Sequence, residues 1–183
     1  MSGLGPVMLM VLAAANPAAG ALSVAWRPSN RDQWRPRVAL AVVAAVGALW
    51  VIAALADPIL DGLSVTTGTW RLATAVPFAV AGLRWMVWPD HPVHDEPRAG
   101  TQVALIALTV LFTPQLVAVV LATAAHDGTL RTMAGVVLAA LVTAALLWFR
   151  AVPTPLLSVT ARLLGGIAIV LAIALGVDGT QTI

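Results

Sequence analysis

The chain has 183 residues, of which 60% are hydrophobic and only 10% are charged, whereas soluble domains carry about 25% charged residues. This composition leaves too few polar side chains to cover a water-soluble core, and it also excludes intrinsic disorder. The net charge of +2 comes from arginine without lysine, and no dense basic block indicates nucleic-acid binding. The absence of cysteine excludes disulfides, thiolate metal sites and cysteine nucleophiles.

Six apolar segments approach or exceed the length of about 20 residues that crosses a bilayer. In chain order they cover residues 4–25, 38–56, 69–88, 102–125, 130–149 and 155–177. No basic residue precedes the first segment, as one would in a signal peptide, so we expect a retained helix. The sequence therefore predicts an all-α, polytopic membrane protein with six transmembrane helices in a single domain, residues 1–183.

Arginines are concentrated in alternate connections between these segments. One set of connections contains Arg27, Arg31, Arg35, Arg37, Arg84, Arg98 and Arg150. The other set contains only Arg71 and Arg131, near Asp57, Asp61 and Asp127. Because cytoplasmic loops carry the excess of basic residues, we expect the Arg-rich connections in the cytoplasm and both termini outside. Richness in Ala, Val and Arg without Lys suggests a bacterial chain, and hence the bacterial plasma membrane.

The first and fourth segments each contain a proline beside polar side chains. These are Asn16-Pro17 in the first segment and Thr113-Pro114-Gln115 in the fourth. Proline cannot donate a hydrogen bond to the carbonyl four residues earlier, and an unpaired carbonyl in lipid must face protein, water or a ligand. We therefore predict that both helices are discontinuous and that the polar side chains at the breaks contact a solute.

The matched positions of the two breaks favour an internal duplication. Three segments in each half give the halves opposite orientations, as in many secondary transporters. We therefore expect two inverted three-helix repeats, about residues 1–88 and 102–183, joined by a cytoplasmic loop at 89–101. Gly20, close to the first break, would allow the backbone to approach a solute.

Two further arginines, Arg71 and Arg162, are candidate site residues. The stretch from Arg71 to Arg84 is too short to cross a hydrocarbon core of about 30 Å at 1.5 Å per residue. Each candidate could anchor an anion, or could pair with Asp57, Asp61 or Asp178. We expect Arg71, beside Trp70 at a segment boundary, to extend to the interface, and Arg162 to matter more because it follows a longer apolar stretch.

The sequence contains no recognisable enzyme or metal-binding motif. The loop from Asp90 to Glu96 includes His91 and His94, but Pro92 and the adjacent Pro97 stiffen it and it holds no further histidine, so we expect a solvated loop. The motifs of serine hydrolases, zinc proteases and nucleotide-binding P-loops do not occur. We therefore expect neither catalysis nor a cofactor nor a bound metal.

Several of these residues resemble the MarC-like family of integral membrane proteins. The ending from Thr160 to Gly165, followed by Asp178-Gly179, is similar to the last helix of that family. Asn16-Pro17 with Gly20 resembles its Asn-Pro-x-Gly signature, and Arg71 resembles the arginine that opens its third helix. A second-half Gly-Pro-Gly is replaced here by Thr113-Pro114-Gln115. The resemblance implies a transporter of small neutral amino acids within the LysE-type exporter superfamily.

The leading hypothesis is a secondary transporter or exporter of a small solute, such as a neutral amino acid. Its substrate-binding residues would be Asn16, Pro17, Gly20, Arg71, Thr113, Pro114, Gln115 and Arg162. The two arginines also fit a phosphate-headed lipid as the substrate. The rival hypothesis is a non-transporting subunit of a larger membrane complex. The expected partners under either hypothesis are the lipid bilayer and either further copies of this chain or a larger membrane complex, and a transporter would also bind a small-molecule or lipid substrate.

Overall fold

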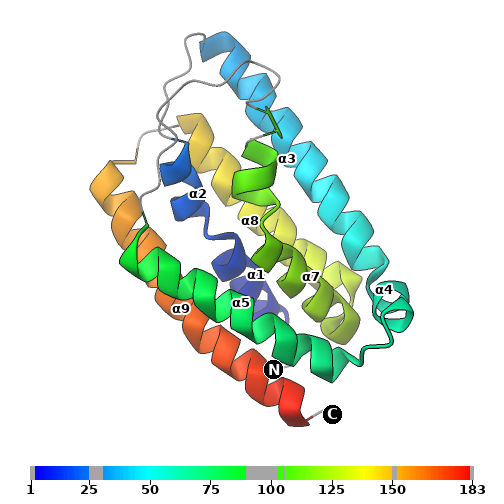
Figure 1. The fold of residues 1–183 in the computed structure, drawn as a ribbon. Coiled ribbons are helices and arrows are strands. Elements are labelled where there is room, and N and C mark those ends of the chain that lie inside the picture. Colours follow the sequence, from blue (N-terminus) through cyan, green and yellow to red (C-terminus); the bar gives the residue numbers. More distant parts are fainter. Residues whose placement is uncertain (1–2, 25–30, 90–102, 105, 150–151, 182–183) are drawn as a thin grey trace.

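The computed structural model describes residues 3–24, 31–89, 103–104, 106–149 and 152–181, and the regular structure within these ranges is helical throughout. Figure 1 shows the helices as one bundle. In chain order the elements are α1 (Leu4–Ala15), α2 (Pro17–Ser23), α3 (Arg31–Ala54), α4 (Ala56–Gly62), α5 (Thr67–Val87), the π-helical turn η1 (Ile106–Leu111), α7 (Pro114–Asp127), α8 (Thr129–Phe149) and α9 (Thr154–Gln181). The prediction of an all-α fold is confirmed for the described part of the chain.

The bundle has two ends, and the elements run between them. The beginning of α1, the end of α9 and the short helix α4 lie at one end, where α7 also turns into α8 (Figure 1). The end of α2 and the beginning of α9 lie at the opposite end, where α5 also finishes. Gly128, with φ 93°, ends α7 and allows the sharp turn into α8.

Four stretches among the described residues are long and apolar enough to cross a membrane. They are Leu4–Ser23, Trp34–Ala54, Thr129–Phe149 and Thr154–Gln181. Two other expected spans do not qualify by length and composition. The helix α5 is long enough, but Arg71 and Arg84 lower its mean hydropathy. The fourth segment is divided into the six residues of η1 and the fourteen of α7, and neither piece is long enough.

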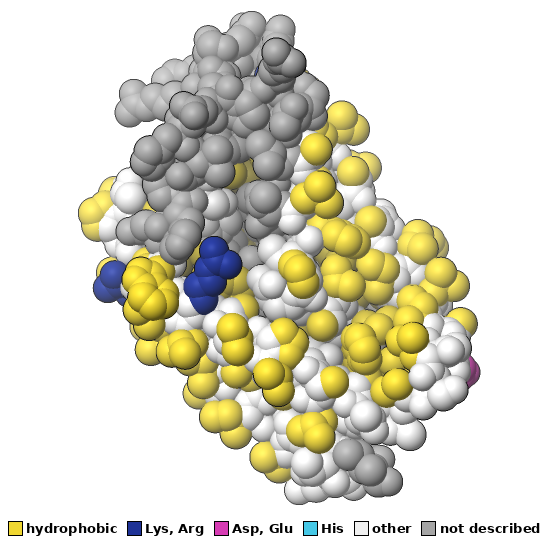
Figure 2. All heavy atoms as spheres, viewed as in Figure 1, with side chains coloured by type: hydrophobic (Ala, Val, Ile, Leu, Met, Phe, Trp, Pro, Cys, Tyr) yellow, Lys and Arg dark blue, Asp and Glu magenta, His cyan; other side chains and the backbone are white. Residues whose placement is uncertain are grey.

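Large hydrophobic side chains cover the outside of the bundle as well as its core. Figure 2 shows them spread over the face in view, with basic side chains near the end of α5 and the beginning of α9. On α9 they form a stripe along one outward face, namely Leu156, Val159, Leu163, Ile167, Val170, Ile173 and Val177. An apolar stripe facing outward is typical of a helix whose solvent is lipid rather than water.

Three boundaries differ from the sequence prediction. The helix α3 begins at Arg31, inside a region expected to be a loop, and α9 continues to Gln181. After residue 56 the expected loop contains the helix α4, with Asp57 in its first turn. Asp57-Pro58 can begin a helix as well as end one, because proline fits the first turn and an acid there is favoured by the helix dipole.

The helices α5 and α9 lie antiparallel and in direct backbone contact. A Cβ atom added at Gly82 would lie 2.7 Å from the carbonyl oxygen of Gly165, and one added at Gly165 would lie 2.7 Å from the carbonyl oxygen of Gly82. Toward the other end, a Cβ atom added at Gly179 would lie 2.8 Å from the carbonyl oxygen of Gly68. These glycines allow an approach that any side chain would prevent, and such faces of small residues are typical of helix packing in membranes.

Candidate functional site: a cavity between two broken helices

The first break is centred on Asn16. Its backbone is left-handed (φ 38°, ψ 71°), a conformation that asparagine tolerates better than most residues. The side-chain oxygen of Asn16 accepts a hydrogen bond from the Ala19 N–H at 3.2 Å, which caps α2. Its Nδ2 donates to the carbonyl oxygen of Ala161 in α9 at 3.0 Å. The predicted discontinuity is therefore confirmed, and Asn16, which is fully buried, holds it against α9.

The second break separates η1 from α7. Phe112 and Thr113 are not helical, and α7 begins at Pro114. Thr113 is extended (φ −82°, ψ 147°) and its side chain makes no capping hydrogen bond. Its Oγ1 is buried without a hydrogen-bond partner. This break confirms the predicted discontinuity of the fourth segment, and it leaves a buried polar atom without a partner at the start of α7.

A cavity of about 390 Å³ joins the two breaks. It brings together predicted site residues from both halves of the chain, namely Asn16, Gly20, Thr113, Pro114 and Gln115. Pro17 is buried in the first turn of α2 and does not line this cavity. The other described lining residues include Ser23 at the end of α2 and Trp88 and Pro89 beyond α5, so the cavity extends from the breaks to that end of the bundle.

The last turn of α5 and the residue that follows it contribute lining residues that were not predicted as site residues. These are Arg84, Trp85 and Trp88. The Trp88 N–H donates to the Arg84 carbonyl at 2.7 Å, which ends the helix at this position. A signal was present in the sequence, because the helix between Arg71 and Arg84 is too short to cross the hydrocarbon core, so one or both must extend to the interface or face a polar interior.

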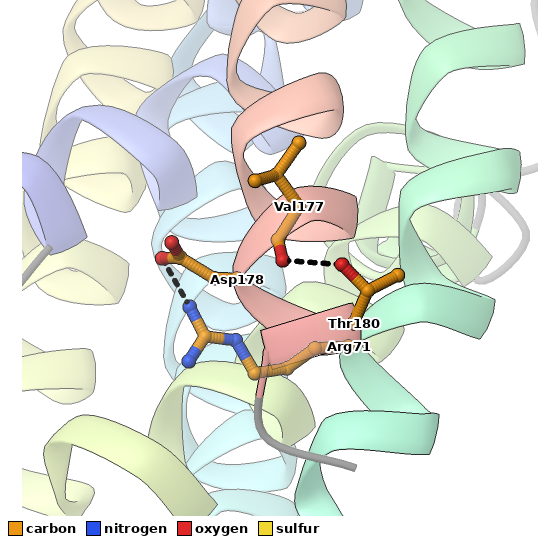
Figure 3. Close-up of polar contacts among 4 residues, drawn as sticks. All are labelled: Arg71, Val177, Asp178 and Thr180. Carbon is orange, nitrogen blue, oxygen red and sulfur yellow. Dashed lines mark hydrogen bonds and ion pairs between the residues drawn. The ribbon is translucent and has the colours of Figure 1, made fainter.

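Arg71 is buried, contrary to the expectation that it extends to the interface. Only 4% of the surface of Arg71 is exposed. Its Nη2 donates a hydrogen bond to Asp178 Oδ2 at 2.9 Å (Figure 3). The glycine contacts between α5 and α9 bring these two side chains together, and pairing with Asp178 was one of the alternatives that the sequence left open. Beside Arg71 lies a void of about 10 Å³. That volume is about the size of one water molecule and too small for a solute.

Arg162 is exposed, contrary to the expectation of a buried cation that needs a partner. It lies on the outward face of α9 next to Leu163, which is 64% exposed, and it does not line the cavity. The helix α9 has 28 residues and so spans about 42 Å, more than a hydrocarbon core of about 30 Å. A long arginine side chain near the beginning of such a helix can extend to the polar interface without a partner.

The described part of the chain contains no group of three or more His, Asp or Glu residues that could hold a metal ion. The loop with His91 and His94 lies outside the described residues. The chain matches no protein-family model, and searches of curated proteins and of solved structures find no significant match. Functional conclusions for this chain therefore depend on its own geometry.

Proposed function

We propose that this protein is a secondary transporter of a small solute and that the cavity between the two helix breaks is its binding site. One observation carries the proposal: two discontinuous helices, one from each half of the chain, contribute polar residues to the same cavity. Discontinuous helices in corresponding positions of two halves mark the substrate site in many secondary transporters. In this proposal the halves 1–88 and 102–183 are inverted three-helix repeats.

The packing of α5 supports six membrane spans rather than four. The helix lies antiparallel to α9, in contact from Gly68–Gly179 to Gly82–Gly165. Its outward face is also apolar, with Val76 at 64% and Val80 at 62% exposure. A helix that accompanies a membrane-spanning neighbour and exposes valine outward is suited to the same hydrocarbon layer. The broken pairs α1–α2 and η1–α7 run between the same two ends of the bundle (Figure 1).

The cavity would open to the cytoplasm of a bacterial cell. It extends to the end of the bundle whose connections contain the excess of arginine, and such connections lie on the cytoplasmic side. Toward the other end, buried apolar residues of α1 and α7, including Met10, Val11, Val119 and Val120, close the path. The Arg71–Asp178 pair joins α5 to α9 at this closed end, so the outward-open form of the transporter requires that region to rearrange.

The size of the cavity favours a small molecule. Its volume of about 390 Å³ lies near the lower end of the range of about 300–1,000 Å³ that is usual for small-molecule sites. A neutral amino acid fits this volume and agrees with the MarC-like resemblance. A phosphate-headed lipid is the alternative substrate, because Arg84 lines the cavity and arginine recognises phosphate well.

Filling the cavity should abolish transport. We expect proteoliposomes that contain the wild-type protein to exchange radiolabelled L-alanine or L-serine. We expect the variant Ser23→Trp to lose at least 90% of that exchange, because Ser23 lines the cavity and is half-buried. The control is Val76→Trp, which adds the same indole to a lipid-facing position. Equal exchange by both variants, or wild-type exchange no faster than protein-free liposomes for a panel of amino acids and lipid phosphates, would count against the proposal.

A second candidate function is that of a non-transporting subunit in a larger membrane complex. The observation that favours it is an apolar groove on the outer face of α3 and α8, lined by Val43, Trp50, Val137 and Leu141 among others. A transmembrane helix of another protein would fit such a groove. Stoichiometric co-purification of an unrelated membrane protein in mild detergent would support this function, and a self-contained particle would favour the transporter.

A further inference from the structure

We infer that the cavity recognises its solute through an anionic group and that Arg84 is the residue that binds this group. The inference rests on the proposed function, because it names the class of solute that the same cavity would carry. It concerns a residue on α5 that the sequence did not single out for binding.

The charges around the cavity favour an anion. Arg84 is exposed and lines the cavity, and it forms no ion pair with any residue that the structure describes. None of the described lining residues is acidic. The described lining of the cavity therefore carries a positive charge from Arg84 and no negative charge, which favours an anionic group over a cationic one.

The second break provides donors for the same group. The helix α7 begins at Pro114 on the wall of the cavity, so the positive end of its dipole faces the solute space. Thr113 Oγ1 is buried there without a partner, and its hydroxyl can donate a hydrogen bond. A carboxylate or a phosphate has the acceptor oxygens to bind the guanidinium of Arg84, and a rotation of the Thr113 side chain toward the cavity would add this hydroxyl.

Two indole rings indicate that the anion carries an organic part. Trp85 and Trp88 line the cavity beside Arg84. Trp85 also packs against Ala18, Ala19 and Leu22 of α2, which fixes its position, whereas Trp88 is 65% exposed. An inorganic ion would leave these apolar surfaces unused, so an organic carboxylate or an organic phosphate fits the site better.

The competing role for Arg84 is that of a membrane-interface cation. A basic residue in the last turn of a helix is favoured by the helix dipole alone, whether or not it binds a solute. An interface cation would not hold a small anion in the cavity, so its replacement by glutamine would leave the affinity for small anions unchanged. A binding experiment with small probes that differ in charge, combined with a variant of Arg84, separates the two roles.

Tryptophan fluorescence provides the measurement, because the chain contains no tyrosine and two tryptophans line the cavity. The purified protein in detergent would be titrated with four probes: propionate, L-alanine, L-alaninamide and glycerol 3-phosphate. We expect binding of probes that carry a carboxylate or phosphate, and at least ten-fold weaker binding of L-alaninamide, which has lost the carboxylate. Binding of propionate and L-alanine would identify a carboxylate solute, whereas binding of glycerol 3-phosphate alone would identify a phosphate-headed one.

The variant Arg84→Gln should weaken binding of the anionic probes at least ten-fold, and Arg84→Lys should recover part of the loss. The control Arg131→Gln removes the same charge from an exposed position on α8 that does not line the cavity, and it should change binding less than two-fold. Equal affinity of Arg84→Gln and the wild type for the anionic probes would overturn the inference, as would no binding of any anionic probe to the wild type. Either result would leave transport of another solute to be decided by the exchange assay.

Discussion

The variant Arg71→Ala should lower the free energy of unfolding by about 3 kcal/mol, the lower end of the range for removing one partner of a buried ion pair. Arg71 has a side chain that is 5% exposed, so its removal takes a buried guanidinium away from the Asp178 carboxylate, which keeps 27% of its side-chain surface accessible. The measurement is thermal or denaturant unfolding of the purified protein in detergent. Arg162→Ala, at an exposed position on α9, should change stability by less than about 0.5 kcal/mol.

A double-mutant cycle tests whether the Arg71 effect comes from its partner. Asp178→Asn keeps the shape of the side chain but leaves the guanidinium of Arg71 without its counter-charge, so it should also destabilise the fold. The double variant Arg71→Ala/Asp178→Asn should be more stable than the sum of the single changes predicts, by about 2 kcal/mol. Additive effects would show that the 2.9 Å contact contributes no coupling and that Arg71 acts only through packing.

The variant Gly165→Ala should destabilise the protein by about 2–3 kcal/mol, as overpacking does in a closely packed interface. The added methyl group would lie 2.7 Å from the carbonyl oxygen of Gly82 and 3.1 Å from the backbone nitrogen of Met86. Both atoms belong to the backbone of α5, so neither can turn away and the two helices must move apart. The same movement would lengthen the contact between Arg71 and Asp178, which depends on the same interface.

The neighbouring glycine provides a matched control. An alanine at Gly166 would meet only the sulfur atom of Met86 at 3.8 Å, an ordinary van der Waals distance. Gly166→Ala should therefore be neutral or slightly stabilising, because alanine is the better helix former. The check is the order of the thermal unfolding midpoints. If Gly166→Ala is as destabilised as Gly165→Ala, the close approach of α5 to α9 is not what the variants report.

The helix breaks could be predicted from the sequence because their causes are local. Pro17 and Pro114 remove hydrogen-bond donors wherever the rest of the chain lies, and Asn16 caps α2 three residues away. The all-α fold followed from composition in the same way. The meeting of the two breaks at one cavity was also expected, because the hypothesis of two inverted repeats assigns both breaks to one binding site.

The environments of Arg71 and Arg162 could not be predicted, because burial is decided by distant residues. Arg71 is buried since Gly68 and Gly179, far apart in sequence, let α5 and α9 touch beside it. Arg162 is exposed since the neighbouring positions Ala161 and Gly165 form the packed face of α9. The hydropathy of the residues around each arginine does not reveal these packing contacts. It indicated that Arg162 would be the more buried of the two, whereas Arg71 is.

The central claim is that the space between the two breaks is a hydrated site open to one side of the membrane. The reactivity of a single cysteine placed in this space tests the claim most directly. The chain has no native cysteine, so Ser23→Cys, on the wall of the cavity, and Val170→Cys, on the outward apolar face of α9, each give one thiol. A charged, membrane-impermeant methanethiosulfonate would be applied to inside-out and right-side-out vesicles. We predict that Ser23→Cys reacts in inside-out vesicles, while Val170→Cys reacts only after denaturation in SDS. A Ser23→Cys thiol that stays unmodified in both kinds of vesicle, yet reacts in SDS, would contradict the account.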